Sequence, residues 1–397
     1  MSNDKTLNRL MLEFEKRKDN QDGTLQIIGA ELKSKRLKLA KTLKSVSNNI
    51  CSISYASKLE NNLINSNRYI INEYGKKVGL DENKIQALYD LKLIIISCID
   101  SFFENDFNYI KDQSDKCLDF TNYRSVIIRL INSLIKRKMD DAYKYILEIM
   151  KITSTLTDFD LNVFSLFYAI YLFYAGLFND ALELIDVIDG QCVPGKFSLL
   201  KELYSFYIHI ALSTYSITEK YQRTKELFIN SNDFEKIDKL TYYLCISFIK
   251  KKDRYHFYKY YELVKNESYR CALTIVYDFL NDFKFDYKKY KKSNIIFADA
   301  LLELSKDPEY AKSYLVNNNT YYIDYNYYIL KYLIYKRIEG TDLLQLLKEV
   351  VDYGTTVEDP FFKGFIYDEA VKYSGNESKY KFIYDIYLKF WGISWKE

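Results

Sequence analysis

Apolar residues recur with helical spacing along most of the chain. From residue 25 to the C-terminus they fall three or four positions apart, and polar breaks interrupt them about every 15–20 residues. Glycine and proline number only 12 and 3 in 397 residues, too few for the dense turns of a β-sandwich or barrel. The pattern therefore predicts an all-α fold.

Helix signals divide the first 80 residues into two parts. Residues 1–24 form a charged N-terminal extension with one short helix over about 5–18. Residues 25–80 predict a compact domain of short helices, in which Thr42 caps a helix over 43–49 and Ser52 caps one over 53–61. A further helix over 68–78 is predicted to end at Gly79.

A weak internal repeat marks the rest of the chain, residues 81–397. The stretches 137–146, 176–185, 252–261 and 306–315 each place a bulky apolar residue after a polar break. Met139 and Phe178 are 39 residues apart, and Phe178 and Tyr255 are 77 apart, about twice that. A period of about 34–40 residues predicts a tetratricopeptide-like superhelical repeat. Small residues at the second helix of a pair let the helices approach closely; these are Ala142, Ala181 and Ala311. A non-repetitive helical bundle is the alternative.

Charge is uneven along the chain. Residues 1–80 hold 15 Lys and Arg against 8 Asp and Glu, a net charge of +7, whereas the remainder holds 42 against 46. A basic N-terminal region on a mildly acidic body fits nucleic acid at one end, although a solvated basic face is the alternative.

Several classes of function are disfavoured. The six cysteines, at 51, 98, 117, 192, 245 and 271, form no C-x-x-C pair and predict free thiols in a reducing cytoplasm. The two histidines form no Cys/His cluster, so a metal site is not expected. The sequence contains no nucleotide-binding or hydrolase motif, so neither a cofactor nor an enzyme is expected. The apolar runs 91–103 and 161–178 are interpreted as buried helices rather than membrane spans.

The region from 28 to 62 predicts a helix-turn-helix. Such a motif lays its second helix in the DNA major groove, here the helix over 53–61. Ala56 and Leu59, supported by Ile50 and Ile53, are predicted to face inward. The predicted outward residues are Ser54, Tyr55, Ser57 and Lys58. Hydroxyls and cations suited to phosphates are Thr42, Lys44, Ser52, Ser57 and Lys58. Long-range attraction is assigned to Lys33, Lys35, Arg36, Lys38, Lys41 and Lys44, against Glu31 alone.

This region resembles the XRE family of helix-turn-helix regulators. The resemblance lies in the run S-x-S-Y-x-S-K-x-E, which extends from Ser52 to Glu60, and in Arg36 on the preceding helix. It implies an ion pair between Arg36 and Glu60, which gives Arg36 a structural role instead of a base-reading one. Two positions depart from the family, because Leu43 replaces a usual Gln and Ser47 a usual Ala.

An XRE domain followed by tetratricopeptide-like repeats resembles the RRNPP family of Gram-positive peptide-pheromone receptors. The resemblance implies a homodimer, a short signalling peptide held in the groove of the repeats, and operator binding controlled by that peptide. Residues 100–118 and 162–189 are most similar to the arbitrium receptors, which regulate lysis and lysogeny in temperate phages. Host quorum-sensing regulators of the PlcR, Rgg and ComR types are close competitors.

Residues for a peptide groove are less distinctive. An extended peptide needs polar side chains that pair with its backbone and pockets for its side chains. The candidates are Tyr204, Tyr207, Lys239, Tyr242, Tyr243, Asn326, Tyr327 and Lys331. For each of them, the alternative is a side chain that only packs against its neighbours or faces solvent. A protein-interaction repeat module without specific DNA binding also stays open, and Leu43 is its main support.

Overall fold

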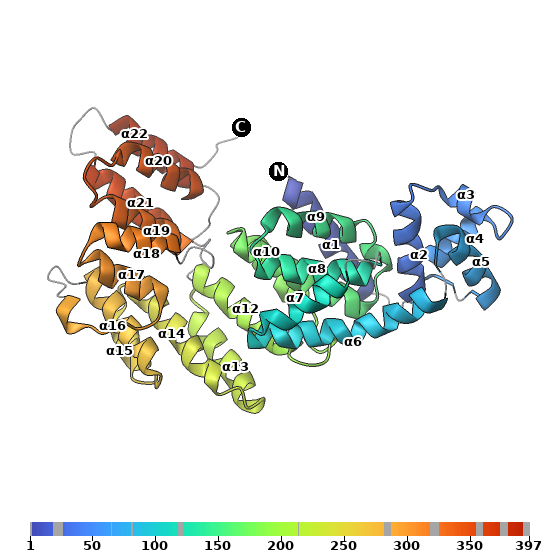
Figure 1. The fold of residues 1–397 in the computed structure, drawn as a ribbon, viewed down its shortest axis with the longest axis horizontal. Coiled ribbons are helices and arrows are strands. Elements are labelled where there is room, and N and C mark those ends of the chain that lie inside the picture. Colours follow the sequence, from blue (N-terminus) through green and yellow to red (C-terminus); the bar gives the residue numbers. More distant parts are fainter. Residues whose placement is uncertain are drawn as a thin grey trace. The chain divides into compact units, whose positions relative to one another are not determined.

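The computed structural model describes residues 2–18, 27–64, 66–80, 82–117, 122–212, 214–281, 287–317, 325–354, 360–373 and 380–391. The prediction of an all-α fold is confirmed, since the regular structure of these residues consists of helices (Figure 1). Residues 27–80 belong to the first of two compact units, so the boundary predicted at residue 80 lies inside that unit.

Unit 1 comprises Met1–Tyr171 and Asp180–Glu202, and unit 2 comprises Leu172–Asn179 and Leu203–Glu397. The chain passes between the units within α10, α11 and α12, and each unit is described by itself. The helices up to α11 are α1 Ser2–Lys18, α2 Ile27–Lys38, α3 Leu43–Ser47, α4 Ile53–Glu60, α5 Arg68–Val78, α6 Glu82–Glu104, α7 Phe107–Lys116, α8 Tyr123–Ile135, α9 Met139–Met150, the 3-10 helix η1 Thr153–Thr155, α10 Asp158–Tyr174 and α11 Phe178–Val187.

The later helices are α12 Phe197–Ala211, α13 Ile217–Asn230, α14 Glu235–Lys250, α15 Arg254–Tyr261, α16 Glu267–Asn281, the 3-10 helix η2 Tyr287–Lys289, α17 Ile296–Leu304, α18 Pro308–Asn317, α19 Tyr325–Tyr335, α20 Leu343–Gly354, α21 Pro360–Tyr373 and α22 Tyr380–Trp391. A buried cluster from α19 to α22, centred on Val350 and Phe362, forms the core of the last four helices.

Local capping explains where the helices of residues 27–80 begin and end. The Thr42 hydroxyl accepts the Ser45 amide at 3.1 Å, and the Ser52 hydroxyl accepts the Tyr55 amide at 3.1 Å. Both predicted N-caps are therefore confirmed. Gly79 ends α5 with a φ of 76°, a left-handed conformation that favours glycine. The predicted stop at Gly79 is also confirmed.

Residues 27–80 have a hydrophobic core of their own. In it α2 packs against α4 and α5, and α3 packs against both of the same helices. The core residues are Leu32, Val46, Ala56, Leu59, Tyr74, Val78 and Leu80. Ala56 and Leu59 face inward as predicted. The prediction for Ile53 is wrong, because this side chain is 47% exposed at the start of α4.

Three of the four repeat-like stretches share one local structure. Arg137, Gly176 and Lys252 each take a left-handed φ just after a helix. In each case the next residue's amide bonds back to the carbonyl five residues earlier. This Schellman turn stops one helix and starts the next. Ala142, Ala181 and Ala311 are fully buried, as expected for small residues at close helix contacts. Helix α9 packs on α8, α15 on α14, and α18 on α17.

Candidate nucleic-acid interface

Helix α4 presents a polar face opposite its buried face. At 100° per residue, Ser54 and Lys58 lie on the side of the helix away from Ala56 and Leu59. Both side chains are exposed, and Ser57 beside them is half-buried. This arrangement offers hydroxyl groups and one ammonium group to a large polar surface, because the helix is held by its apolar side.

The two cap residues retain hydrogen-bonding capacity. Thr42 and Ser52 are exposed, and each hydroxyl oxygen already accepts a backbone amide at the start of its helix. A hydroxyl that accepts one bond still carries a proton that it can donate. Both O–H groups are therefore available to an acceptor such as a phosphate oxygen.

Tyr55 lies at the side of the exposed face. Its hydroxyl donates to Ser66 Oγ at 3.0 Å, and the ring is half-buried. The outward placement predicted for Tyr55 therefore holds only in part. The exposed residue that the sequence analysis missed is Ile53, which lies next to Ser54 and offers an apolar contact.

Most of the cations that are predicted to attract DNA form contacts with other groups of unit 1. Lys33 donates to Asn61 at 3.0 Å and to Ser154 at 3.3 Å, and burial lowers its pKa. Lys38 lies 2.7 Å from Glu148. Lys35 lies 4.0 Å from Glu31, and Lys41 donates to the Lys77 carbonyl. These four of the six cations thus have partners inside unit 1, which limits their direct contact with DNA, and their long-range attraction stays a prediction.

Two lysines of this surface stay available. Lys44 and Lys58 are exposed, and neither side-chain ammonium has an ion pair or hydrogen bond within the described part of the chain. The surrounding charge is also favourable. Residues 27–80 hold ten Lys and Arg against three Glu, so the whole excess of +7 lies in this segment. Paired or not, these cations contribute to the long-range field.

The ion pair implied by the XRE resemblance is present. Arg36 Nε lies 2.7 Å from Glu60 Oε1, and its Nη2 lies 2.8 Å from Oε2. The buried Tyr74 hydroxyl donates to Glu60 Oε1 at 2.6 Å. Burial of the phenol and its bond to Glu60 raise the pKa of Tyr74, and the bond to Glu60 raises the pKa of Arg36. Arg36 therefore braces α2 against α4.

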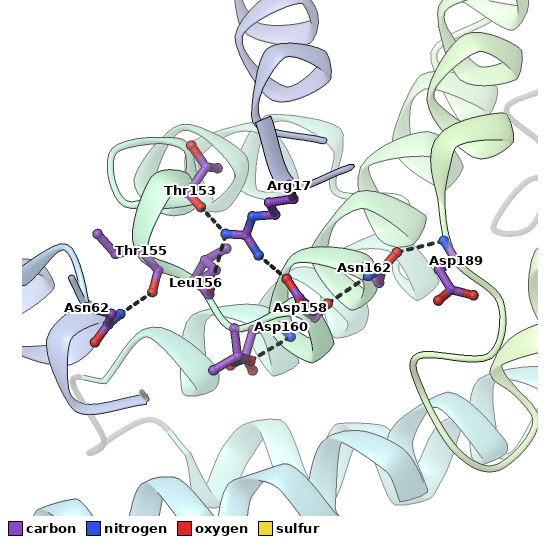
Figure 2. Close-up of polar contacts among 10 residues, drawn as sticks. Arg17, Asn62, Thr153, Thr155, Leu156, Asp158, Asp160, Asn162 and Asp189 are labelled. Atoms are coloured by element: carbon purple, nitrogen blue, oxygen red, sulfur yellow. Dashed lines mark hydrogen bonds and ion pairs between the residues drawn. The ribbon is translucent and has the colours of Figure 1, made fainter. Parts of the chain in front are cut away.

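Helix α2 and the end of α4 are fixed to the segment around η1. Asn62 donates to the Thr155 carbonyl at 2.9 Å (Figure 2). Its side-chain oxygen also accepts the Gly29 amide at 3.1 Å. A Cβ at Gly29 would lie 2.1 Å from Asn62 Oδ1, so this approach requires glycine. Arg17 of α1 also reaches this segment, donating to the Leu156 carbonyl at 2.8 Å (Figure 2). The end of α4 is thus hydrogen-bonded to the rest of unit 1.

Glu31 forms a second link between α2 and the rest of unit 1. Its buried carboxyl group accepts the Tyr123 amide at 3.2 Å, at the start of α8. Desolvation raises the pKa of Glu31 to about 7, and the bond to Tyr123 and the nearby Lys35 oppose this only in part. A buried carboxyl that titrates near neutrality lies where α2 meets α8.

The residues predicted to bind a peptide fall into separate groups in unit 2. Lys239, Tyr242 and Tyr243 line one cavity of about 360 Å³. The hydroxyl groups of Tyr204 and Tyr174 hydrogen-bond to each other, and the Tyr207 ring packs edge-on against Tyr243.

The remaining three peptide candidates lie in α19. Lys331 is ion-paired with Glu349 at 2.9 Å. The side chains of Asn326 and Tyr327 lie outside the described residues. The cavity therefore gathers three of the eight predicted residues.

Comparisons with protein-family models, curated proteins and solved structures found no match to this chain. Within the described residues, His, Cys, Asp and Glu nowhere gather in a group able to hold a metal ion. None of the described helices combines the length and apolar character that a membrane span requires.

Proposed function

We propose that this protein is a DNA-binding transcription regulator. Residues 27–80 act as an XRE-type helix-turn-helix domain, in which α4 enters the major groove and α3 lies against the backbone. Ser54 and Lys58 contact base edges, with Ile53 as an apolar contact beside them. Thr42, Lys44, Ser52 and Ser57 contact phosphates, and Tyr55 flanks the base-reading face.

One observation carries this proposal. Helix α4 combines a fully buried apolar side with an exposed polar side, and it is capped and braced by contacts that leave Ser54 and Lys58 outside. A solvated surface helix needs no such bracing on several sides. A recognition helix does need it, because base contacts depend on a fixed orientation of a few side chains.

The remainder of the chain serves as the sensor in this proposal. Residues 81–397 form tetratricopeptide-like repeats that bind a short signalling peptide and bring two copies together, which matches a two-fold operator. The recurring Schellman turns and the buried Ala142, Ala181 and Ala311 support helical-hairpin repeats. The resemblance to RRNPP receptors favours an arbitrium-type regulator, with a host regulator of the PlcR or Rgg type as the alternative.

Selection of duplexes from a random DNA library by the full chain tests this function. We expect one enriched motif, whose affinity falls steeply with salt because Lys and Arg release counterions on binding. Lys58→Glu is expected to weaken binding to that duplex by about 10-fold or more, because it removes a contact and adds repulsion in the groove.

Lys111→Glu is the matched control, since Lys111 is an exposed lysine on α7 and the charge change is identical. This variant is expected to bind within about 2-fold of the original protein, because Lys111 lies on α7, outside the helices that are proposed to contact the duplex. Equal affinities for the two variants, or no enriched motif at all, would contradict the proposal.

A protein-interaction module is the second candidate, and the engaged cations favour it. Lys33 and Lys38 bind Ser154 and Glu148 within unit 1, so less of the basic charge reaches outward than the sequence predicts. In that case the duplex selection yields no motif, and Lys58→Glu leaves nucleic-acid binding unchanged.

A further inference from the structure

The cavity in unit 2 has an uneven chemical lining. It occupies about 360 Å³ among α12, α14, α16, α17, α19 and α21. Its walls are mainly aliphatic, with the rings of Tyr242, Tyr243 and Tyr269 on one side. Lys239 and Lys250 are its charged lining residues, and no Asp or Glu is among the described residues that line it. The cavity is thus apolar, aromatic and positively charged.

Lys239 is the least compensated of these groups. It lies half-buried at the start of the second turn of α14, and its ammonium has no hydrogen bond or ion pair among the residues that the structure describes. Burial lowers the pKa of Lys239, and the nearby charge of Lys236 lowers it further. The adjacent Asp238 carboxylate accepts the backbone amides of Lys265 and Asn266. An ammonium in this position gains most from an anion that enters the cavity.

The volume limits what this anion can be. Ligand pockets span about 300–1,000 Å³, so this cavity is at the small end and encloses the end of a chain instead of a whole extended peptide. A phosphate group carries up to two negative charges and needs many donors, which mostly aliphatic walls do not offer. A carboxylate attached to an apolar or aromatic group matches one lysine, the tyrosine rings and the aliphatic walls together.

We propose that this cavity binds a carboxylate carried by an apolar or aromatic group, with Lys239 as its counter-ion. This inference rests on the proposed sensing function and specifies the chemistry of its ligand. The carboxylate belongs either to the C-terminal residue of a peptide or to a small organic acid. In the first case the cavity reads the free end of the signal, and the rest of the peptide lies outside it.

Binding to the full chain distinguishes these sources. The probes are a library of pentapeptides ending in Leu or Phe, each as free acid and as C-terminal amide, together with 4-phenylbutyrate and its amide. Binding is measured by calorimetry. We expect the free acid of the tightest peptide to bind at least about 10-fold more tightly than its amide, because the amide leaves the lysine without a counter-ion. A similar preference for 4-phenylbutyrate indicates a site for small acids as well.

Lys239→Met is expected to abolish the preference for acid over amide, and Lys239→Arg to retain most of it. Lys236→Met is the matched control, because it makes the same change three residues earlier on α14 without lining the cavity. Three results would overturn the inference. Acids and amides bind equally, neither of them binds, or a folded Lys239→Met protein keeps the preference for acids.

The outcome is separable from that of the proposed function. Duplex selection is carried out without any of these probes, so a missing DNA motif together with a Lys239-dependent acid preference contradicts only the regulator. An enriched DNA motif without a Lys239-dependent acid preference contradicts only the carboxylate site.

Discussion

Two buried clusters in unit 1 use the same chemistry at different depths. Arg36 holds Glu60 through two hydrogen bonds within residues 27–80, and Arg124 holds Asp160 in the same way between α8 and α10. The Arg36 side chain is 11% exposed, whereas that of Arg124 is 2% exposed. The difference matters because removing one partner from a buried pair leaves a desolvated charge, and the cost grows with burial.

A tyrosine completes each cluster. Tyr74 donates to Glu60 at 2.6 Å, and Tyr123 donates to Asp160 at 2.8 Å. Asp160 also accepts the Thr157 hydroxyl at 2.6 Å. The deeper carboxylate thus has more donors around it, as a buried charge requires. The comparison indicates that the cluster between α8 and α10 stabilises unit 1 more, whereas the one in residues 27–80 chiefly orients α4.

The largest effect is expected from Asp160→Asn. This change keeps the shape of the side chain and leaves the Arg124 charge buried without its counter-ion. The free energy of unfolding is expected to fall by about 3–5 kcal/mol, measured by urea denaturation. Asp158→Asn, two residues earlier on the same helix, removes a surface partner of Arg17 and is expected to cost less than about 1 kcal/mol. Similar losses in the two variants would contradict the comparison.

Glu60→Gln is expected to have the second-largest effect, a loss of about 2–3 kcal/mol. The loss is smaller because Arg36 is partly exposed and still donates to the Lys41 carbonyl at 3.0 Å. If the pair between Arg36 and Glu60 orients α4, the affinity for DNA is also expected to fall, in protein that is still folded. Glu73→Gln, which removes a surface pair with Lys76, serves as the control for both measurements. A change in stability without any change in DNA affinity would remove the orienting role.

Local signals made most of residues 27–80 predictable. Thr42, Ser52 and Gly79 act on backbone groups within a few positions, so their roles are visible in a short stretch of sequence. The pair between Arg36 and Glu60 spans 24 residues and was predicted only through the resemblance to a family. The partners Ser154 of Lys33 and Glu148 of Lys38 were not predicted, because they lie more than a hundred residues away along the chain.

The sequence contains weaker signals for the structure of the rest of unit 1 and for the cavity. Arg124 and Asp160 are 36 residues apart, and the apolar stretch 123–135 holds a second arginine, Arg129, so no local signal singles out Arg124. In α14, Lys239, Tyr242 and Tyr243 were predicted together because they are three or four positions apart on one helix. The other walls come from helices whose approach depends on long-range packing, which periodicity does not encode.

The smallest effect concerns Glu31, which joins the helices of the two clusters, since it lies on α2 and accepts the Tyr123 amide of α8. In the folded protein Glu31 keeps its proton up to about pH 7, whereas its ordinary pKa is 4.5. The folded state therefore binds the proton more tightly than the unfolded chain. The resulting stabilisation is full below pH 4.5 and is lost as the pH rises through 7.

Glu31→Gln tests this link, because it keeps an acceptor for the Tyr123 amide without a charge. At pH 8 the variant is expected to be more stable than the original protein by about 1–2 kcal/mol, since it buries no carboxylate. At pH 4 the two proteins are expected to differ by less than about 0.5 kcal/mol, because Glu31 is then mostly protonated in the folded and the unfolded state alike. Urea denaturation at both pH values measures the two differences. If they are equal, folding does not raise the pKa of Glu31, and α2 meets α8 through a charge. If the variant is less stable at pH 8, the pairing of Glu31 with Lys35 outweighs its desolvation.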